Sequence, residues 1–200
     1  MDILVIAPME QERDNFLEAL KRKREELGTL RNHYHVLQCG VGKATAAMRT
    51  EEWFHYYEDV PLDMIALIGY AAGGRDHCQG DFVIPSIAVF HDADVPPVPL
   101  FEPLRRRYSL RGTEPCTVAT GDCFVGRMKA RRLERAYGRR TIFDMESAAV
   151  AMVAEKERLP LLVMKWISDI PGSFNNYQSF EEFVSTHTDF QRFVEVLEQF

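Results

Sequence analysis

The sequence predicts an α/β protein: a single three-layer α-β-α domain built on a central twisted mixed sheet. Short apolar runs alternate with segments of helical periodicity along the whole chain, residues 1–200. Residues 161–167 are apolar enough for a strand that is buried on both faces. Residues 141–170 have the pattern strand, helix, strand, a unit that is normally right-handed and belongs to a parallel or mixed sheet.

The elements follow one another in a regular order. Short apolar runs predict the strands, at residues 2–8, 34–39, 63–69, 80–90, 115–120, 141–143 and 161–167. Helical spacing predicts the helices, over residues 9–26, 44–57, 145–156 and 180–197 and in an Arg-rich segment from residue 126. In the first helix Phe16, Leu17 and Leu20 share one side. Pro85 interrupts the fourth strand, which favours an edge or a bulge, and Ser179 is the expected N-cap of the last helix.

The unit at residues 141–170 also concentrates acidic residues. The apolar side of its helix consists of Met145, Ala148, Ala149, Met152 and Val153. Asp144 and Glu146 follow the first strand of the unit, and Asp169 follows the second. Ligands of open α/β sheets bind at the carboxyl ends of the strands. We therefore expect two neighbouring strands to deliver carboxylates to one crevice.

Composition argues against several classes of protein. A net charge of −6 disfavours a nucleic-acid binder, and the basic clusters at residues 105–107 and 127–140 are expected to be solvated helix faces or turns. The apolar run at residues 3–8 is too short for a signal peptide, and no run approaches the roughly 18–20 apolar residues of a membrane span. The cysteines lack metal-site spacing and are expected to be free thiols: Cys39, Cys78, Cys116 and Cys123. We expect a soluble, cytoplasmic protein.

Three local patterns are ambiguous by themselves. The GVGK turn at residues 40–43 could bring backbone N–H groups close to an anion, but tight packing of a strand against a helix is the better explanation of this motif by itself. His91, Asp92 and Asp94 are spaced too closely for good metal ligation, so we expect neither a metal nor a cofactor. The proline-rich stretch at residues 95–111 is long enough to be a functional or interface loop.

Together these patterns resemble the nucleoside phosphorylase/nucleosidase superfamily, and most closely its 5′-methylthioadenosine/S-adenosylhomocysteine nucleosidase branch. The similarity covers nearly the whole chain. The motifs that carry it are APMEQE (7–12), CGVGKATAA (39–47), AAGG (71–74), HDADV (91–95), TGDCF (120–124), MES (145–147), ISD (167–169) and SFEEF (179–183). The resemblance implies an enzyme that cleaves the N-ribosidic bond of a small purine nucleoside, and a symmetric homodimer.

The resemblance also implies roles for individual residues. Glu12 matches the general base that activates the attacking water, and Asp169 matches the acid that protonates the leaving purine near N7. Asp169 must then hold a proton near neutral pH, which requires burial or acidic neighbours; the apolar strand before it offers burial. Glu146 matches the carboxylate that grips the ribose hydroxyls, with the backbone of Met145 beside it.

Three further residues complete the substrate site that the resemblance implies. Phe124 matches the ring that stacks on the purine, although an aromatic residue in a pattern like this is often part of the core. The backbone of Val125 would contact the edge of the base, and Ser168 would orient Asp169.

The chain departs from the branch at three places. Ala71 stands where a serine usually helps to hold the water. Lys165 stands where an arginine is usual, and lysine keeps the charge but loses the planar fork. The segment between HDADV and TGDCF is shorter than usual; in the branch it reaches into the neighbouring subunit's pocket and covers the 5′ substituent.

Three hypotheses stay open. The first is a hydrolase of purine nucleosides, with a 5′-substituted adenosine as substrate. The second is a phosphorylase, which needs clustered cations for phosphate; its members typically carry an arginine within the stretch that is apolar here, residues 66–68, although Lys43 or Lys165 could contact an anion. The third is a non-catalytic nucleoside-binding relative, which Ala71, Lys165 and the short segment suggest.

Overall fold

The computed structural model describes residues 1–100, 116–172 and 176–200. Its strands are β1 (Asp2–Ala7), β2 (His33–Gln38), β3 (Met64–Gly73), β4 (Phe82–Val83), β5 (Ile87–Phe90), β6 (Val98–Pro99), β7 (Thr117–Thr120), β8 (Ile142–Asp144) and β9 (Leu161–Asp169). Its helices are α1 (Glu10–Leu27), α2 (Lys43–Tyr56), α4 (Arg127–Tyr137), α5 (Ser147–Glu157), α6 (Asn176–Thr186) and α7 (Gln191–Leu197).

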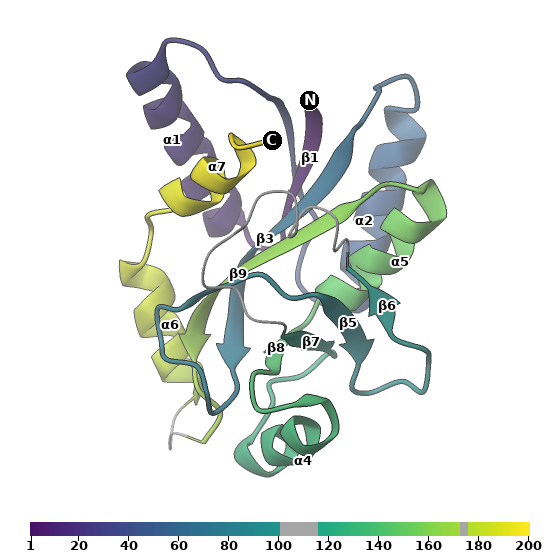
Figure 1. Ribbon diagram of the computed structural model, residues 1–200, viewed down its shortest axis with the longest axis vertical. Helices are drawn as coiled ribbons and strands as arrows, with labels where there is room; N and C mark the ends of the chain where they lie inside the picture. Colours follow the sequence, from purple (N-terminus) through teal and green to yellow (C-terminus); the bar gives the residue numbers. More distant parts are fainter. Residues whose placement is uncertain (101–115, 173–175) are drawn as a thin grey trace.

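The strands form one mixed sheet with the order β2-β1-β3-β8-β7-β5-β6, and β9 pairs with β3 and β4. Helices α2 and α5 cover one face of this sheet, and α1, α6 and α7 lie on the other (Figure 1). Alternate residues of β1 show the three layers: Leu4 and Ile6 pack with the α2 and α5 side, and Ile3 and Val5 pack with the α1 and α7 side. The predicted three-layer α-β-α fold with a mixed sheet is therefore confirmed.

The strand–helix–strand unit differs from our expectation in one respect. β9 runs parallel to β3, but β8 runs antiparallel to the end of β3, with Phe143 opposite Ala72. The two strands are therefore separate partners of β3 and not neighbours that pair with each other. Their acidic ends still meet, because Asp144 and Asp169 both lie beside the carboxyl end of β3.

Other boundaries also need correction. The third strand runs four residues further than predicted, to Gly73. The predicted strand at residues 80–90 is two strands, because the chain leaves β9 after β4, passes Pro85 and joins β7 as β5. The predicted last helix is also two, α6 and α7, and Ser179 lies inside α6 instead of capping it.

Two residues assigned to apolar helix sides face solvent. Leu17 is 43% exposed and Met152 is 53% exposed, while the small residues beside Met152 in α5 are buried. The predicted basic cluster at residues 105–107 and most of the proline-rich stretch lie outside the described residues. Within the described ranges, no helix is both long and apolar enough to cross a membrane.

Candidate active site

A cavity of about 300 Å³ opens beside the carboxyl ends of β3 and β9. Segments that are far apart in the sequence form its wall: the start of α1, the end of β3, the loop after β7, the end of β8, the end of β9 and α6. The wall contains these sequence-predicted site residues: Glu12, Ala71, Phe124, Val125, Met145, Glu146, Ser168 and Asp169. Lys165, the remaining predicted residue, lies behind the wall and is fully buried.

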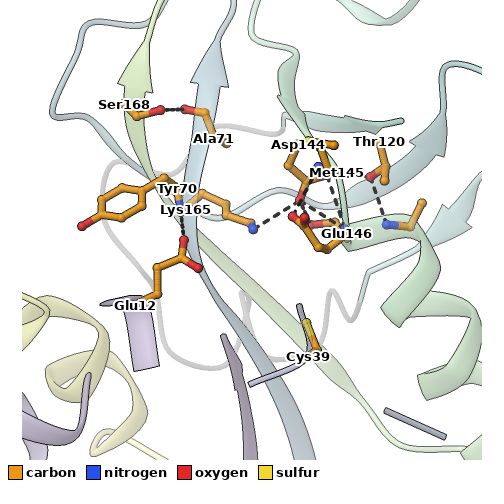
Figure 2. A network of polar contacts seen from close by, with 12 residues as sticks. Glu12, Cys39, Tyr70, Ala71, Thr120, Asp144, Met145, Glu146, Lys165 and Ser168 are labelled. Carbon is orange, nitrogen blue, oxygen red and sulfur yellow. Dashed lines mark hydrogen bonds and ion pairs between the residues drawn. The ribbon is translucent and has the colours of Figure 1, made fainter. Parts of the chain in front are cut away.

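Glu12 is a buried carboxylate in the first turn of α1. Its Oε2 accepts a hydrogen bond from the Met9 N–H at 2.7 Å. Its Oε1 accepts one from the Tyr70 N–H at 2.9 Å (Figure 2). Gly69 makes room for it: a Cβ at that position would lie 2.3 Å from Oε1. Burial raises the pKa of Glu12 to about 7, against the opposing charge of Lys165 and the two N–H groups. Glu12 is therefore suited to accept a proton near neutral pH.

Asp144 and Lys165 form a buried ion pair behind the cavity wall. Lys165 Nζ lies 3.2 Å from Asp144 Oδ2. Asp144 also accepts hydrogen bonds from the Thr120 hydroxyl at 2.7 Å and from the backbone N–H and hydroxyl of Ser147. Burial by itself lowers the pKa of Lys165, because it disfavours the charged form. The nearby carboxylates, of which Asp144 has the largest effect, favour the charged form more strongly, so the pKa is raised.

Glu146 precedes the first turn of α5 and is buried. Its Oε1 accepts the Gly42 N–H at 2.9 Å, and its Oε2 accepts the Met145 N–H at 3.3 Å. Burial raises the pKa of Glu146 to about 7, with Lys165 opposing and Asp144 adding to the rise. The glycine turn thus does present an N–H group to an anion, but the anion is a side chain of the same protein.

Ser168 and Asp169 end strand β9 side by side in the cavity wall. The Ser168 hydroxyl donates to Asp169 Oδ1 at 2.8 Å. The other oxygen, Oδ2, is buried and has no hydrogen-bond partner among the described residues. Burial raises the pKa of Asp169, and the bond from Ser168 opposes that rise. The carboxyl group is therefore placed to carry a proton into the cavity.

Aromatic rings line the cavity beside these carboxyl groups. Phe124 is 50% exposed, so it is a wall residue and not part of the core. Its ring meets the rings of Tyr177 and Phe180 edge-on, at centroid distances of 5.7 and 5.8 Å. Val125 is buried and packs against α4. A flat apolar ligand would find a partner for its face here.

The cations considered for anion binding are already paired. Lys43 Nζ lies 2.6 Å from Asp92 Oδ1 and 3.6 Å from Asp122 Oδ2, and Lys165 is paired with Asp144. Among the described residues that form the cavity wall there is no lysine, arginine or histidine.

The sequence places Asp144 at a strand end but indicates no role for it, and no motif singles out Tyr70 or Gly69. One signal for Asp144 was available. A lysine inside an apolar strand that is buried on both faces requires a buried carboxylate partner, and Asp144 was a candidate.

Comparison with known proteins gives a consistent result. The model of the phosphorylase superfamily matches residues 2–197. A 5′-methylthioadenosine/S-adenosylhomocysteine nucleosidase of Bacillus cereus (strain B4264) is 30% identical over 221 residues, covering 92% of this chain and 92% of its own. The corresponding protein of Geobacillus kaustophilus (strain HTA426) is 29% identical over 174 residues, covering 76% and 72% of the two chains.

Solved structures share the fold. The S-adenosylhomocysteine nucleosidase of Streptococcus pyogenes, in complex with 5-methylthiotubericidin, has a TM-score of 0.82 at 21% identity, covering 100% of this chain and 97% of that chain. A nucleosidase of Colwellia psychrerythraea 34H, in complex with adenine, has a TM-score of 0.78 at 21% identity, covering 100% and 95%.

Proposed function

Because the chain belongs to the phosphorylase superfamily, and within it to the family of the methylthioadenosine/adenosylhomocysteine nucleosidases, we propose that it hydrolyses the N-ribosidic bond of a purine nucleoside. The substrate class is a 5′-substituted adenosine. The observation that carries the proposal is the convergence of Glu12, Glu146 and Asp169 on one cavity, each buried and each with a raised pKa. Perturbed carboxyl groups in one pocket are typical of acid–base catalysis.

Asp169 acts as the acid in this proposal. As the bond between C1′ and N9 breaks, negative charge builds on the purine, and a proton delivered to N7 makes the base a better leaving group. Burial favours the protonated form of Asp169, and Oδ2 is free of other partners in the described structure. Ser168 holds the other oxygen and so fixes the direction of the acid.

Glu12 acts as the base. Its carboxylate takes a proton from a water molecule, and the water oxygen forms the new bond to C1′ as the purine leaves with the proton from Asp169. Two backbone N–H groups fix the Glu12 carboxylate in one orientation, which supports this role. Glu146 accepts hydrogen bonds from the ribose hydroxyls, with the backbone of Met145 beside it. Phe124 stacks on the purine, and the backbone of Val125 contacts its edge.

Water is the favoured nucleophile over phosphate. Phosphorolysis needs cations that are available to the attacking anion. Lys43 and Lys165 are both neutralised by carboxylates of the chain, and no cation is among the described wall residues. Ala71 removes a hydroxyl from the wall, so the water depends on the carboxylates to hold it.

We further propose that the whole chain acts as one domain, in the cytoplasm, and as a homodimer. Cys39, Cys78 and Cys123 form no disulfide, which fits a reducing compartment. A groove of about 620 Å³ lies between α2 and α5. Apolar residues, including the exposed Val95 and Met152, make up most of its lining, and the charged residues Lys43, Glu51 and Lys156 also line it. It also contains Asp122, directly before the cavity residues Cys123 and Phe124, so a second copy seated there would reach the cavity rim. Sedimentation at micromolar concentration tests this; a monomer would contradict it.

The decisive experiment is release of adenine from a panel of nucleosides, with and without phosphate. Wild type, Asp169→Asn and the exposed control Asp59→Asn are compared. Release that is independent of phosphate, lost in Asp169→Asn and kept in the control, supports the hydrolase. Phosphate-dependent release with ribose 1-phosphate as product would indicate a phosphorylase. Adenine binding without turnover, measured by calorimetry, would indicate a non-catalytic relative.

A further inference from the structure

Strand β9 has a β-bulge at its carboxyl end, directly before Asp169. Ala71 pairs with Ile167, but the next residue of β3, Ala72, pairs with Asp169, so the ladder skips Ser168. Successive side chains of a regular strand point to opposite faces of the sheet. Here Ser168 and Asp169 both line the cavity and are bonded to each other, which a regular strand would not allow. The bulge therefore sets the direction of the Asp169 carboxyl group.

One side chain outside the cavity holds this bulge. The Gln79 Nε2 amide donates a hydrogen bond of 2.7 Å to the backbone carbonyl of Ser168, the residue that the ladder skips. The backbone of the preceding residue, Ile167, is paired: the Gly80 N–H donates to the Ile167 carbonyl, and the Ile167 N–H donates to the Asp81 carbonyl, both at 2.8 Å. Backbone groups supply those two bonds, whereas the third requires a side-chain donor.

The connection that carries Gln79 is itself anchored. The His77 side chain is buried, and its Nε2 lies 3.0 Å from the Arg140 carbonyl. The Cys78 N–H donates to Asp81 Oδ2 at 2.8 Å. Gln79 therefore extends from a fixed piece of backbone, and its amide restrains the bulge.

We infer that Gln79 is a positioning residue for Asp169: its amide fixes the backbone of the bulge and, through it, the direction of the acid. The inference rests on the proposed function, in which Asp169 protonates the leaving base. Gln79 is not part of the cavity wall, so it acts through Asp169 and not on the substrate. Proton transfer depends on hydrogen-bond geometry, and small displacements of a catalytic group lower the rate strongly.

The test replaces the donor without changing the shape of the side chain. Gln79→Glu places a carboxylate oxygen against the Ser168 carbonyl, which breaks the bond. We expect kcat for adenine release to fall about tenfold while KM stays within about threefold, because the acid acts in the transition state. Gln79→Lys restores a donor and is expected to recover most of kcat.

The matched control is Gln199→Glu, which removes a hydrogen bond of the same kind, from Gln199 Nε2 to the Glu195 carbonyl, at a helix end away from the cavity. Its kcat should equal that of wild type. Thermal unfolding of each variant shows that the rates are measured on folded protein.

Three results would overturn the inference: wild-type kcat in Gln79→Glu, a rise in KM alone, or Gln79→Lys as impaired as Gln79→Glu. The variant Asp169→Asn distinguishes a failure of this inference from a failure of the proposed function. If it is inactive while Gln79→Glu is normal, the inference fails and the proposed function stands. If Asp169→Asn keeps the wild-type rate, the proposed function fails and the inference fails with it.

Discussion

The Nζ of Lys165 lies 3.2 Å from Asp144 Oδ2, and neither side chain is more than 1% exposed. The Lys165 side chain lies between Glu12 and Glu146, the two carboxylates proposed as base and ribose ligand (Figure 2). Burial raises the pKa of both carboxyl groups, and the charge of Lys165 opposes that rise. The lysine therefore does two things at once. It compensates a buried aspartate, and it limits how far burial can raise the pKa of its neighbours.

Removing the lysine charge should destabilise the fold. Lys165→Met leaves Asp144 buried without a counter-charge, and we expect the free energy of unfolding to fall by about 3–5 kcal/mol. Urea denaturation at pH 8 measures this change. In the double variant Lys165→Met/Asp144→Asn the uncompensated charge is gone, so part of the stability should return. A loss below about 1 kcal/mol in the single variant would show that the pair contributes no more than a surface ion pair does.

Adding one methyl group at Gly69 should disable the proposed base. Gly69 has a φ of +138° and a Cβ there would lie 2.3 Å from Glu12 Oε1, so Gly69→Ala must displace the carboxylate. We expect kcat/KM for adenine release to fall about a hundredfold. Gly28→Ala is the matched control, because Gly28 also has a positive φ but has no atom within 4 Å of its virtual Cβ and lies outside the cavity wall. If both variants lose activity equally, backbone strain and not the displaced carboxylate is the cause.

Much of the fold could be predicted because its central strands β1, β3 and β9 are apolar and buried on both faces. The direction of β8 could not, because a three-residue strand contains no pattern that distinguishes parallel from antiparallel pairing with β3. The break between α6 and α7 could not be predicted from the sequence pattern either. It occurs where the Tyr70 hydroxyl donates to the His187 carbonyl at 2.6 Å, a contact between residues 117 positions apart.

Glu146 and Asp169 could be predicted as site residues because they stand at the carboxyl ends of strands, whereas the role of Glu12 followed only from the resemblance to the nucleosidases. Contacts between residues that only the tertiary structure brings together could not be predicted from the sequence. The pairing of Lys165 with Asp144 requires β8 and β9 to meet the same end of β3. This contact matters for the site, because Lys165 and Asp144 both affect the pKa of Glu12 and of Glu146.

Truncating the ring at the cavity rim should weaken binding of the base. Phe124→Ala removes the surface on which a purine can stack, and stacking on one aromatic ring contributes about 1–3 kcal/mol. We therefore expect the Kd for adenine, measured by calorimetry, to rise roughly 5- to 150-fold. Tyr56→Ala is the control, since Tyr56 is an exposed aromatic residue away from this cavity. An unchanged Kd for adenine in Phe124→Ala would show that the Phe124 ring does not stack on the bound base.

The raised pKa of Glu12 predicts opposite effects of pH on activity and on stability. A base works only when deprotonated, so kcat/KM should fall about tenfold per pH unit below its pKa of about 7. The folded state binds this proton more tightly than an ordinary carboxylate with a pKa of 4.5 does. Between these two values the free energy of unfolding should therefore decrease as pH rises, contrary to the usual behaviour of paired carboxylates. Kinetics and urea denaturation from pH 5 to pH 8 measure both slopes. A kcat/KM that stays level down to pH 5 would show that the base titrates normally and that burial of Glu12 does not control the reaction.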